Sequence, residues 1–175
     1  MEQQLSHRLG INEVKTLART IPTLPLWKLM QGNTDATARN AAWILTHKTD
    51  AEVATLPQQQ LIDLAMTTPE VALRRLALHL ISRQPMGKED LRADFLDYCL
   101  QHMTLLEEPS GVQALCMKLA HSMCRYYPEL QKEFADTLKL MHIEHYKPGV
   151  KHLAGKLRKQ RSESKKSHID STPPR

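Results

Sequence analysis

The chain is poor in the residues that build β-sheets and in the runs that cross membranes. Aromatic residues make up only 5% of its 175 residues, and only six residues are glycine. Aromatic and β-branched side chains favour strands, so this composition argues against a β-sandwich and favours helices lined by leucine and alanine. No run approaches about eighteen consecutive apolar residues, so we expect no membrane-spanning helix.

Signals for export and for cofactor binding are also missing. The first residues, MEQQLSHRLG, are polar and lack the apolar core of a signal peptide, which makes the cytoplasm the expected location. There is no phosphate-binding loop and no dinucleotide-binding glycine signature. Cys99, Cys116 and Cys124 lie in apolar helical runs. We expect them to be buried free thiols rather than a disulfide or metal ligands.

The positive charge is concentrated at the C-terminal end. The formal net charge is +5, and residues 147–175 hold nine lysines and arginines against Glu163 and Asp170. The remaining residues hold fifteen basic and seventeen acidic side chains. Apolar periodicity stops after Gln160. We therefore expect residues 161–175 to form a flexible basic tail.

Prolines divide the chain into amphipathic helices. Eight of the ten prolines lie between segments whose apolar residues recur at spacings of three and four, the helical period. No comparable stretch alternates with the period of a strand, so the chain is predicted to be all-α. Besides the repeated segments described next, the pattern predicts helices over residues 13–20, 24–31, 57–66, 88–103 and 128–146. Asn12 is the expected cap of the first of these helices.

One kind of helical segment occurs four times. Its apolar residues lie at offsets of zero, three, four and seven, which form one stripe along a helix. The first stripe residues are separated by 35, 39 and 38 positions, and they are Ala38, Leu73, Val112 and Val150. The third stripe residues are small, and they are Ala42, Ala77, Cys116 and Ala154. A helical hairpin recurring at this pitch, each burying its stripe against its neighbour, predicts an α-solenoid.

The repeated segments resemble the second helix of HEAT repeats. TDATARNAAWIL, TPEVALRRLALHL and EPSGVQALCMKLA each open on a short turn and continue into small and leucine positions. The body from about residue 24 to residue 160 is also similar to small bacterial HEAT-like proteins, through Arg39 to His47, Tyr127 to Leu130 and Pro148 to Lys151. The resemblance implies an all-α, right-handed α-α superhelix of about four helical hairpins. It would form a single domain over residues 1–160, with residues 1–23 as an N-terminal cap.

Basic and acidic side chains are sorted between two kinds of helix. The repeated B segments (37–48, 71–83, 111–125 and 149–161) hold twelve of the 24 lysines and arginines and none of the 19 acidic residues. The helix dipole favours cations near helix C-termini and accounts for four of the twelve. It does not account for four others, which lie in first turns, where the dipole disfavours cations. These are Arg39, Arg74, Arg75 and Lys151.

In the proteins that the chain resembles, the B helices line the concave face of the solenoid. The resemblance therefore implies a basic band on that face, which would attract an anionic partner because walls of low dielectric focus the field. A solvated face without a special role is the alternative. The candidate binding residues are Arg39, Trp43, His47, Arg75, His79, Lys118, His121, Lys156 and Lys159.

Residues that carry chemistry occur only in incomplete sets. His142, Glu144 and His145 have the spacing of two helical metal ligands without an evident third. Two Cys–His pairs at a spacing of three lack an orienting carboxylate. These pairs are Cys99 with His102 and His121 with Cys124. We expect no metal site and no cofactor.

The resemblance extends in fold to DNA alkylation-repair proteins, whose glycosylases place tryptophans and an acidic residue against the damaged nucleotide. Trp43 occupies a comparable place, but the position one turn later is His47, and the B segments offer no carboxylate. An oxocarbenium-like transition state would then lack its main electrostatic stabilisation. We expect no enzyme, but a binding or scaffold module that presents its basic surface to a protein or other macromolecule. The alternative is a nucleic-acid-binding protein.

Overall fold

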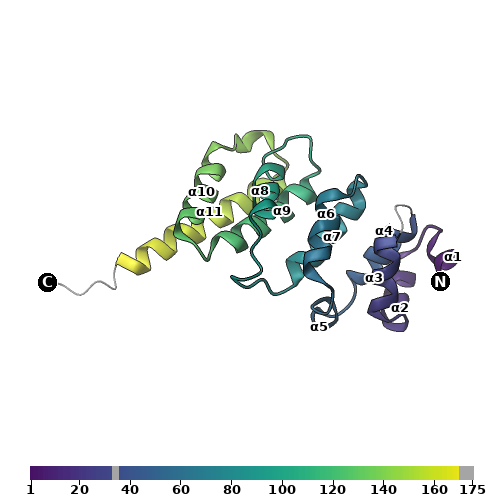
Figure 1. The fold of residues 1–175 in the computed structure, drawn as a ribbon. Helices are drawn as coiled ribbons and strands as arrows, with labels where there is room; N and C mark the ends of the chain where they lie inside the picture. The colour runs from purple at the N-terminus through teal and green to yellow at the C-terminus, as the bar shows by residue number, and fades with distance from the viewer. Residues whose placement is uncertain (33–35, 170–175) are drawn as a thin grey trace. The chain divides into compact units, whose positions relative to one another are not determined.

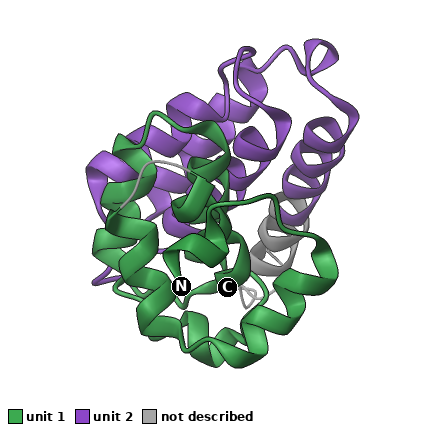
Figure 2. Ribbon diagram, turned by 90° about the vertical axis from the view of Figure 1, so that its right-hand side faces the viewer, with its two compact units in different colours: residues 1–87 green, residues 88–175 purple. Residues whose placement is uncertain are grey.

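The computed structural model describes residues 1–32 and 36–169, with side chains as far as Gln160. Every regular element in those ranges is helical, as predicted: eleven α-helices and one 3-10 turn (Figure 1). The contacts divide the chain into two compact units, Met1–Gly87 and Lys88–Arg175, which Figure 2 colours separately. Among the described helices, none combines the length and the apolar character that a membrane span requires.

Unit 1 contains two helical hairpins and an N-terminal cap. Its helices are α1 (Glu2–Leu5), α2 (Ile11–Thr20), α3 (Thr23–Gly32), α4 (Ala36–Leu45), α5 (Asp50–Val53), α6 (Gln58–Thr67) and α7 (Val71–Arg83). α3 packs on α4 and α6 packs on α7, while the two repeated helices, α4 and α7, pack on each other. α1 and α2 both contact α4, so the N-terminal residues cover the first hairpin.

Unit 2 repeats this arrangement. Its elements are α8 (Ala93–His102), α9 (Ser110–Cys124), α10 (Pro128–Leu140), the 3-10 turn η1 (Ile143–His145) and α11 (Pro148–Ile169). α8 packs on α9, and α10 contacts both α9 and α11. The repeated helices α9 and α11 pack on each other, as α4 and α7 do in unit 1.

The repeated apolar stripe forms the core of both units. Of its sixteen residues, fourteen are buried, and only Leu115 and Leu153 in unit 2 are half-buried. All four small residues of the third position have no exposed surface. Each buried leucine contributes about 1.5–3 kcal/mol through the hydrophobic effect. The spacing read from the sequence therefore identified the buried face of each repeated helix.

Polar side chains at the end of α7 hold the preceding loop. Arg83 donates to the carbonyl oxygens of Thr46 and Lys48 at 2.7 and 2.6 Å, and its Nη2 lies 2.7 Å from Oδ1 of Asp50. The buried amide of Gln84 donates to the carbonyl oxygens of Val53, the last residue of α5, and of Leu56, at 3.0 and 2.8 Å. These side chains thus add donors to backbone carbonyls at and beyond the ends of α4 and α5.

The short helix α5 begins at a capping box. The Thr49 hydroxyl accepts from the N–H of Glu52 at 3.3 Å, and the Glu52 carboxylate accepts from the N–H of Thr49 at 3.0 Å. The N–H of Thr49 and its hydroxyl, which donates to the same carboxylate at 2.8 Å, lower the pKa of Glu52 to about 2, together with the ammonium of Lys48 at 3.0 Å. The Thr-x-x-Glu pattern is a local signal for this helix, which the periodicity alone did not reveal because α5 is only four residues long.

Several predicted boundaries differ from the structure. The helix expected over residues 128–146 ends at Leu140, and the separate turn η1 follows it. Asn12 lies inside α2, whose cap is Gly10. The helix expected from Lys88 begins only at Ala93. α11 continues to Ile169, so residues 161–169 of the expected flexible tail are helical, while residues 170–175 lie outside the described part. The extent of the single domain, residues 1–160, stays a prediction.

We predict that Gln84→Ala destabilises the protein by about 1–3 kcal/mol, because the carbonyls of Val53 and Leu56 lose their buried donor. Urea unfolding followed by circular dichroism measures this free energy. Gln101→Ala is the control, because Gln101 is exposed on α8, and we expect it to change stability by less than about 0.5 kcal/mol. Equal effects of the two substitutions would contradict the assigned role.

Candidate functional site

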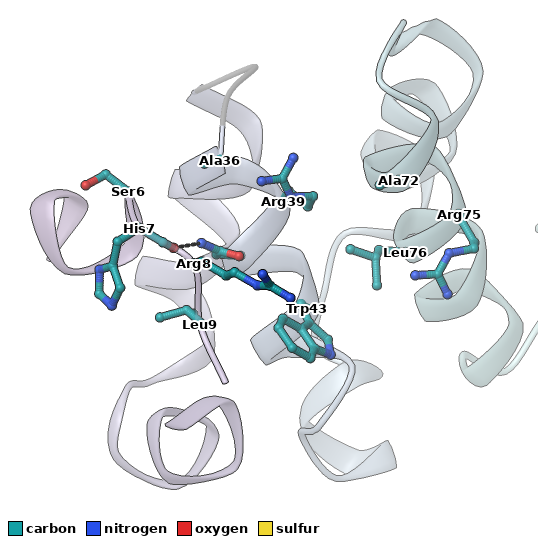
Figure 3. Close-up of a pocket in the computed structure, with 11 residues that line it drawn as sticks. Ser6, His7, Arg8, Leu9, Ala36, Arg39, Trp43, Ala72, Arg75 and Leu76 are labelled. Atoms are coloured by element: carbon teal, nitrogen blue, oxygen red, sulfur yellow. Dashed lines mark hydrogen bonds between the residues drawn. The ribbon is translucent and has the colours of Figure 1, made fainter. Parts of the chain in front are cut away.

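Unit 1 carries a pocket of about 630 Å³ between the N-terminal segment, α4 and α7 (Figure 3). Three arginines border it: Arg8, Arg39 and Arg75. None of its described lining residues is acidic. The full lining consists of Ser6, His7, Arg8, Leu9, Ala36, Arg39, Asn40, Trp43, Ala72, Arg75 and Leu76. The pocket therefore combines one sign of charge with apolar walls.

The two repeated helices supply the larger part of the pocket. Arg39 and Trp43 lie one turn apart on α4, so both side chains are on the same face of that helix. Arg75 lies on α7, which packs on α4. Figure 3 shows Arg39 and Trp43 projecting from α4 and Arg75 from the neighbouring helix. The stripe that packs the helices together thus also brings these three side chains to one site.

The third arginine comes from the segment between α1 and α2, and Asn40 anchors that segment. Asn40 is only 5% exposed, and its amide nitrogen donates to the carbonyl oxygens of Leu5 and His7, both at 2.8 Å. The side chains of Leu5 and Leu9 are buried on either side of this contact. The segment is thereby held beside α4, and Figure 3 shows the Arg8 side chain directed towards Trp43.

The basic residues of the first two B segments differ in whether they have partners. Lys48 and Arg83 are committed to Glu52 and Asp50 near the ends of α4 and α7. Arg8, Arg39 and Arg75 are exposed, and within residues 1–32 and 36–160 none of them has an ion-pair partner. The described lining of the pocket therefore carries a net positive charge.

Only three of the nine predicted binding residues meet in this pocket: Arg39, Trp43 and Arg75. His47 follows the end of α4 and is exposed, and His79 is half-buried on α7, but neither lines the pocket. The other four lie in unit 2. These are Lys118, His121, Lys156 and Lys159. Whether all nine form one continuous band stays a prediction.

Two of the predicted histidines contribute little positive charge at neutral pH. The His121 ring packs on Phe134 of α10, with 5.5 Å between ring centroids. Burial, and then the charge of Arg125, lower the pKa of His121. Partial desolvation of the His47 ring, although the residue is exposed overall, also lowers its pKa, followed by the charges of Lys15 and Arg83. The three lysines of unit 2 are exposed on α9 and α11.

The pocket residues missed from the sequence belong to the N-terminal segment, Arg8 above all. One signal was present in the repeated segment itself, because Asn40 is a polar residue within the small and apolar run that begins at Ala38. A buried amide at such a place needs partners. Its partners are 33 and 35 residues away, and no local pattern identifies them.

Three of the histidines considered for metal binding or catalysis lie in two places, around η1 and at the end of α8. His142, Glu144 and His145 are exposed around η1, with the two imidazoles 3.6 and 3.7 Å from Oε1 of Glu144. No group of three metal-binding side chains occurs in the part of the chain that the structure describes. The expectation that the Cys99–His102 pair lacks a carboxylate partner is wrong, because Nδ1 of His102 lies 2.7 Å from Oε1 of Glu108, and the His102 ring stacks on Tyr98.

The three cysteines are buried free thiols, as predicted. Burial raises the pKa of Cys99 far above its ordinary value, and a hydrogen bond with Cys116 adds to this effect. Burial, and then the charge of Glu133, raise the pKa of Cys124 to about 11. Because the thiolate is the nucleophile, Cys99 and Cys124 are inert at neutral pH.

Helical hairpins that stack through a repeated apolar stripe define a helical-repeat protein. A family model described as a HEAT repeat domain matches residues 1–161, and the chain therefore belongs to the HEAT repeat family. HEAT repeats generally serve as scaffolds for protein–protein interaction, and the family is typically non-catalytic. No curated protein and no solved structure is significantly similar to the chain.

We predict that Asn40→Ala releases the N-terminal segment, since the carbonyls of Leu5 and His7 lose their buried donor. The expected loss of stability is about 1–3 kcal/mol, and amide hydrogen exchange should accelerate over residues 5–9 more than over α6. Asn12→Ala, at an exposed position of α2, serves as the control. Unchanged exchange in this segment would show that Asn40 does not anchor it.

We also predict that His47 titrates below 6.5, its ordinary pKa, because burial and the charges of Lys15 and Arg83 disfavour the imidazolium. The native state then resists protonation, so His47 costs stability as the pH falls below 6.5. Nuclear magnetic resonance measures the titration directly. Lys15→Ala should raise the pKa of His47, whereas Lys28→Ala should not. A pKa at or above 6.5 in the unchanged protein would refute the prediction.

Proposed function

We propose that the chain is a non-catalytic binding module whose arginine face receives an acidic segment of a protein partner. The arginine face consists of Arg8, Arg39 and Arg75 around Trp43. The single observation that carries the proposal is that three arginines line one pocket without ion-pair partners among the described residues. Membership of the HEAT repeat family, which generally provides interaction scaffolds, agrees with this function.

The chemistry of the arginine face suits carboxylates. Guanidinium groups bind carboxylates through two parallel hydrogen bonds, and such bonds are stronger when water is excluded. Trp43 and Leu76 supply an apolar surface beside the charges. Tryptophan and arginine are the side chains that most often dominate the energy of an interface, particularly in pockets that become fully desolvated. An acidic segment with one or two apolar anchors would match both properties.

Nucleic acid is a second candidate partner, favoured by the indole of Trp43 among the arginines. Bases stack on aromatic side chains while arginines contact phosphates. Exposed Lys151, Lys156 and Lys159 on α11 would add contacts to phosphates. Binding of this kind falls steeply with salt, because each neutralised phosphate releases counterions. Glycosylase activity is not part of either proposal, since Trp43 has no carboxylate beside it among the described lining residues.

We predict that Arg39→Glu/Arg75→Glu lowers the yield of a captured protein partner by about 10-fold or more, the equivalent of at least about 1.4 kcal/mol. The experiment compares the unchanged and substituted chains as bait, after nuclease treatment, with quantitative mass spectrometry. Lys15→Glu/Lys28→Glu is the matched control, because it reverses two exposed charges on α2 and α3 outside the pocket.

The outcomes separate the two candidate partners. Proteins retained by the control and lost by the arginine variant support the proposal. Proteins lost on nuclease treatment alone point to nucleic acid, and salt-sensitive gel shifts that require Arg39 and Arg75 would establish that alternative. Capture of the same proteins by both double variants would show that the arginine face does not bind the partner.

A further inference from the structure

We infer that the pocket at the centre of the arginine face binds a nucleoside phosphate, with the base against Trp43 and the phosphate among the three arginines. This inference rests on the proposed function in one respect, since both use Arg39 and Arg75 as the anion-binding groups. It goes further by giving the pocket a small ligand of defined chemistry. The ligand would occupy the site that the acidic segment of a partner contacts.

The size and lining of the pocket fit a small molecule with two different ends. Its volume of about 630 Å³ lies within the range of about 300–1,000 Å³ that is usual for small-molecule sites. Trp43, Leu9 and Leu76 provide apolar walls, while the arginines provide positive charge. Ala36 and Ala72 also line the pocket, and their short side chains leave room there. A plain phosphate would leave the apolar walls uncovered.

Trp43 is the natural platform for a planar base. The chain has two tryptophans, and they have different environments: Trp27 is 4% exposed in the core, whereas Trp43 is half-buried at the pocket. Stacking of a base on an aromatic side chain tolerates any base, since every base has a π-face. The inference therefore includes no preference among bases.

The charge of the pocket fits a phosphate better than a single carboxylate. A phosphate monoester carries about −1.5 to −2 charges at neutral pH and has three acceptor oxygens. Arg8, Arg39 and Arg75 come from three separate segments and all line the pocket, so a phosphate could be bound by whichever of them it lies nearest. Among the described lining residues no carboxylate competes for them. One carboxylate would neutralise only one of the three.

The test uses the fluorescence of Trp43. Trp27→Phe removes the other tryptophan, and thermal melting by circular dichroism checks that the variant folds. We expect AMP to quench Trp43 to saturation, with ADP binding at least as tightly, and adenosine and inorganic phosphate each binding at least about 10-fold more weakly than AMP. Isothermal titration calorimetry on the unchanged chain repeats the comparison without any tryptophan substitution.

Substitutions test separately the contributions of Trp43 and of the arginines to binding. Trp43→Leu should weaken AMP about 10-fold in calorimetry while leaving inorganic phosphate unchanged. Arg39→Glu/Arg75→Glu should abolish binding of both ligands, and Lys15→Glu/Lys28→Glu should change neither. Arg39→Lys should recover part of the affinity, because it keeps the charge but loses the paired hydrogen bonds.

Several outcomes would overturn the inference. AMP binding no tighter than inorganic phosphate would show that the base does not stack on Trp43. Phenyl phosphate binding as tightly as AMP would show that the pocket recognises any aromatic ring joined to a phosphate, and not a nucleoside. Binding of an oligonucleotide without binding of AMP would assign the site to a nucleic-acid strand. If AMP fails while charge reversal still removes the protein partner, the proposed function stands and this inference alone is wrong.

Discussion

The contact of one repeated helix on the next is the constraint on which the rest of the structure depends. In unit 1 this contact joins α4 to α7, and in unit 2 it joins α9 to α11. Small residues at the third stripe position, such as Ala42 and Ala77, are fully buried. They allow the backbones to approach closely, and larger side chains there would cost about 1–3 kcal/mol through overpacking. Because α4 and α7 are adjacent, Arg39 and Arg75 meet at one pocket although they are 36 positions apart.

The same helices use basic residues in two ways. Near the ends of α4 and α7, Lys48 and Arg83 bind carboxylates, and Arg83 also binds loop carbonyls. Those cations are part of the scaffold, since they satisfy backbone groups between successive hairpins. In the first turns, Arg39 and Arg75 line the pocket together with Arg8. The helix dipole disfavours cations at such places, so the local physics of the helix does not explain them.

Periodicity in the sequence predicted the helices and their buried faces, because burial of a stripe at spacings of three and four leaves a direct pattern. The resemblance to HEAT repeats, which implies a basic band on the B helices, included Arg39, Trp43 and Arg75 among its nine candidate residues, and these three line the pocket. It did not predict Arg8, whose position depends on the bond from Asn40 to backbone 33 residues away. The end of α11 was also missed. Residues 161–169 have no apolar spacing, yet an existing helix extends at little cost through residues of fair helix propensity.

The cost of gathering three guanidinium groups argues that the pocket has a use. Like charges that line one pocket are not favoured by the fold itself, and no described residue pairs with these three as an ion pair. Elsewhere in unit 1 the fold neutralises its less exposed cations, as with Lys48 and Glu52. Sequence and structure usually agree at every level except at functional sites, where a local penalty is offset by a ligand. At the arginine face the unfavourable feature is a set of cations without described ion-pair partners, and an anionic ligand would offset it.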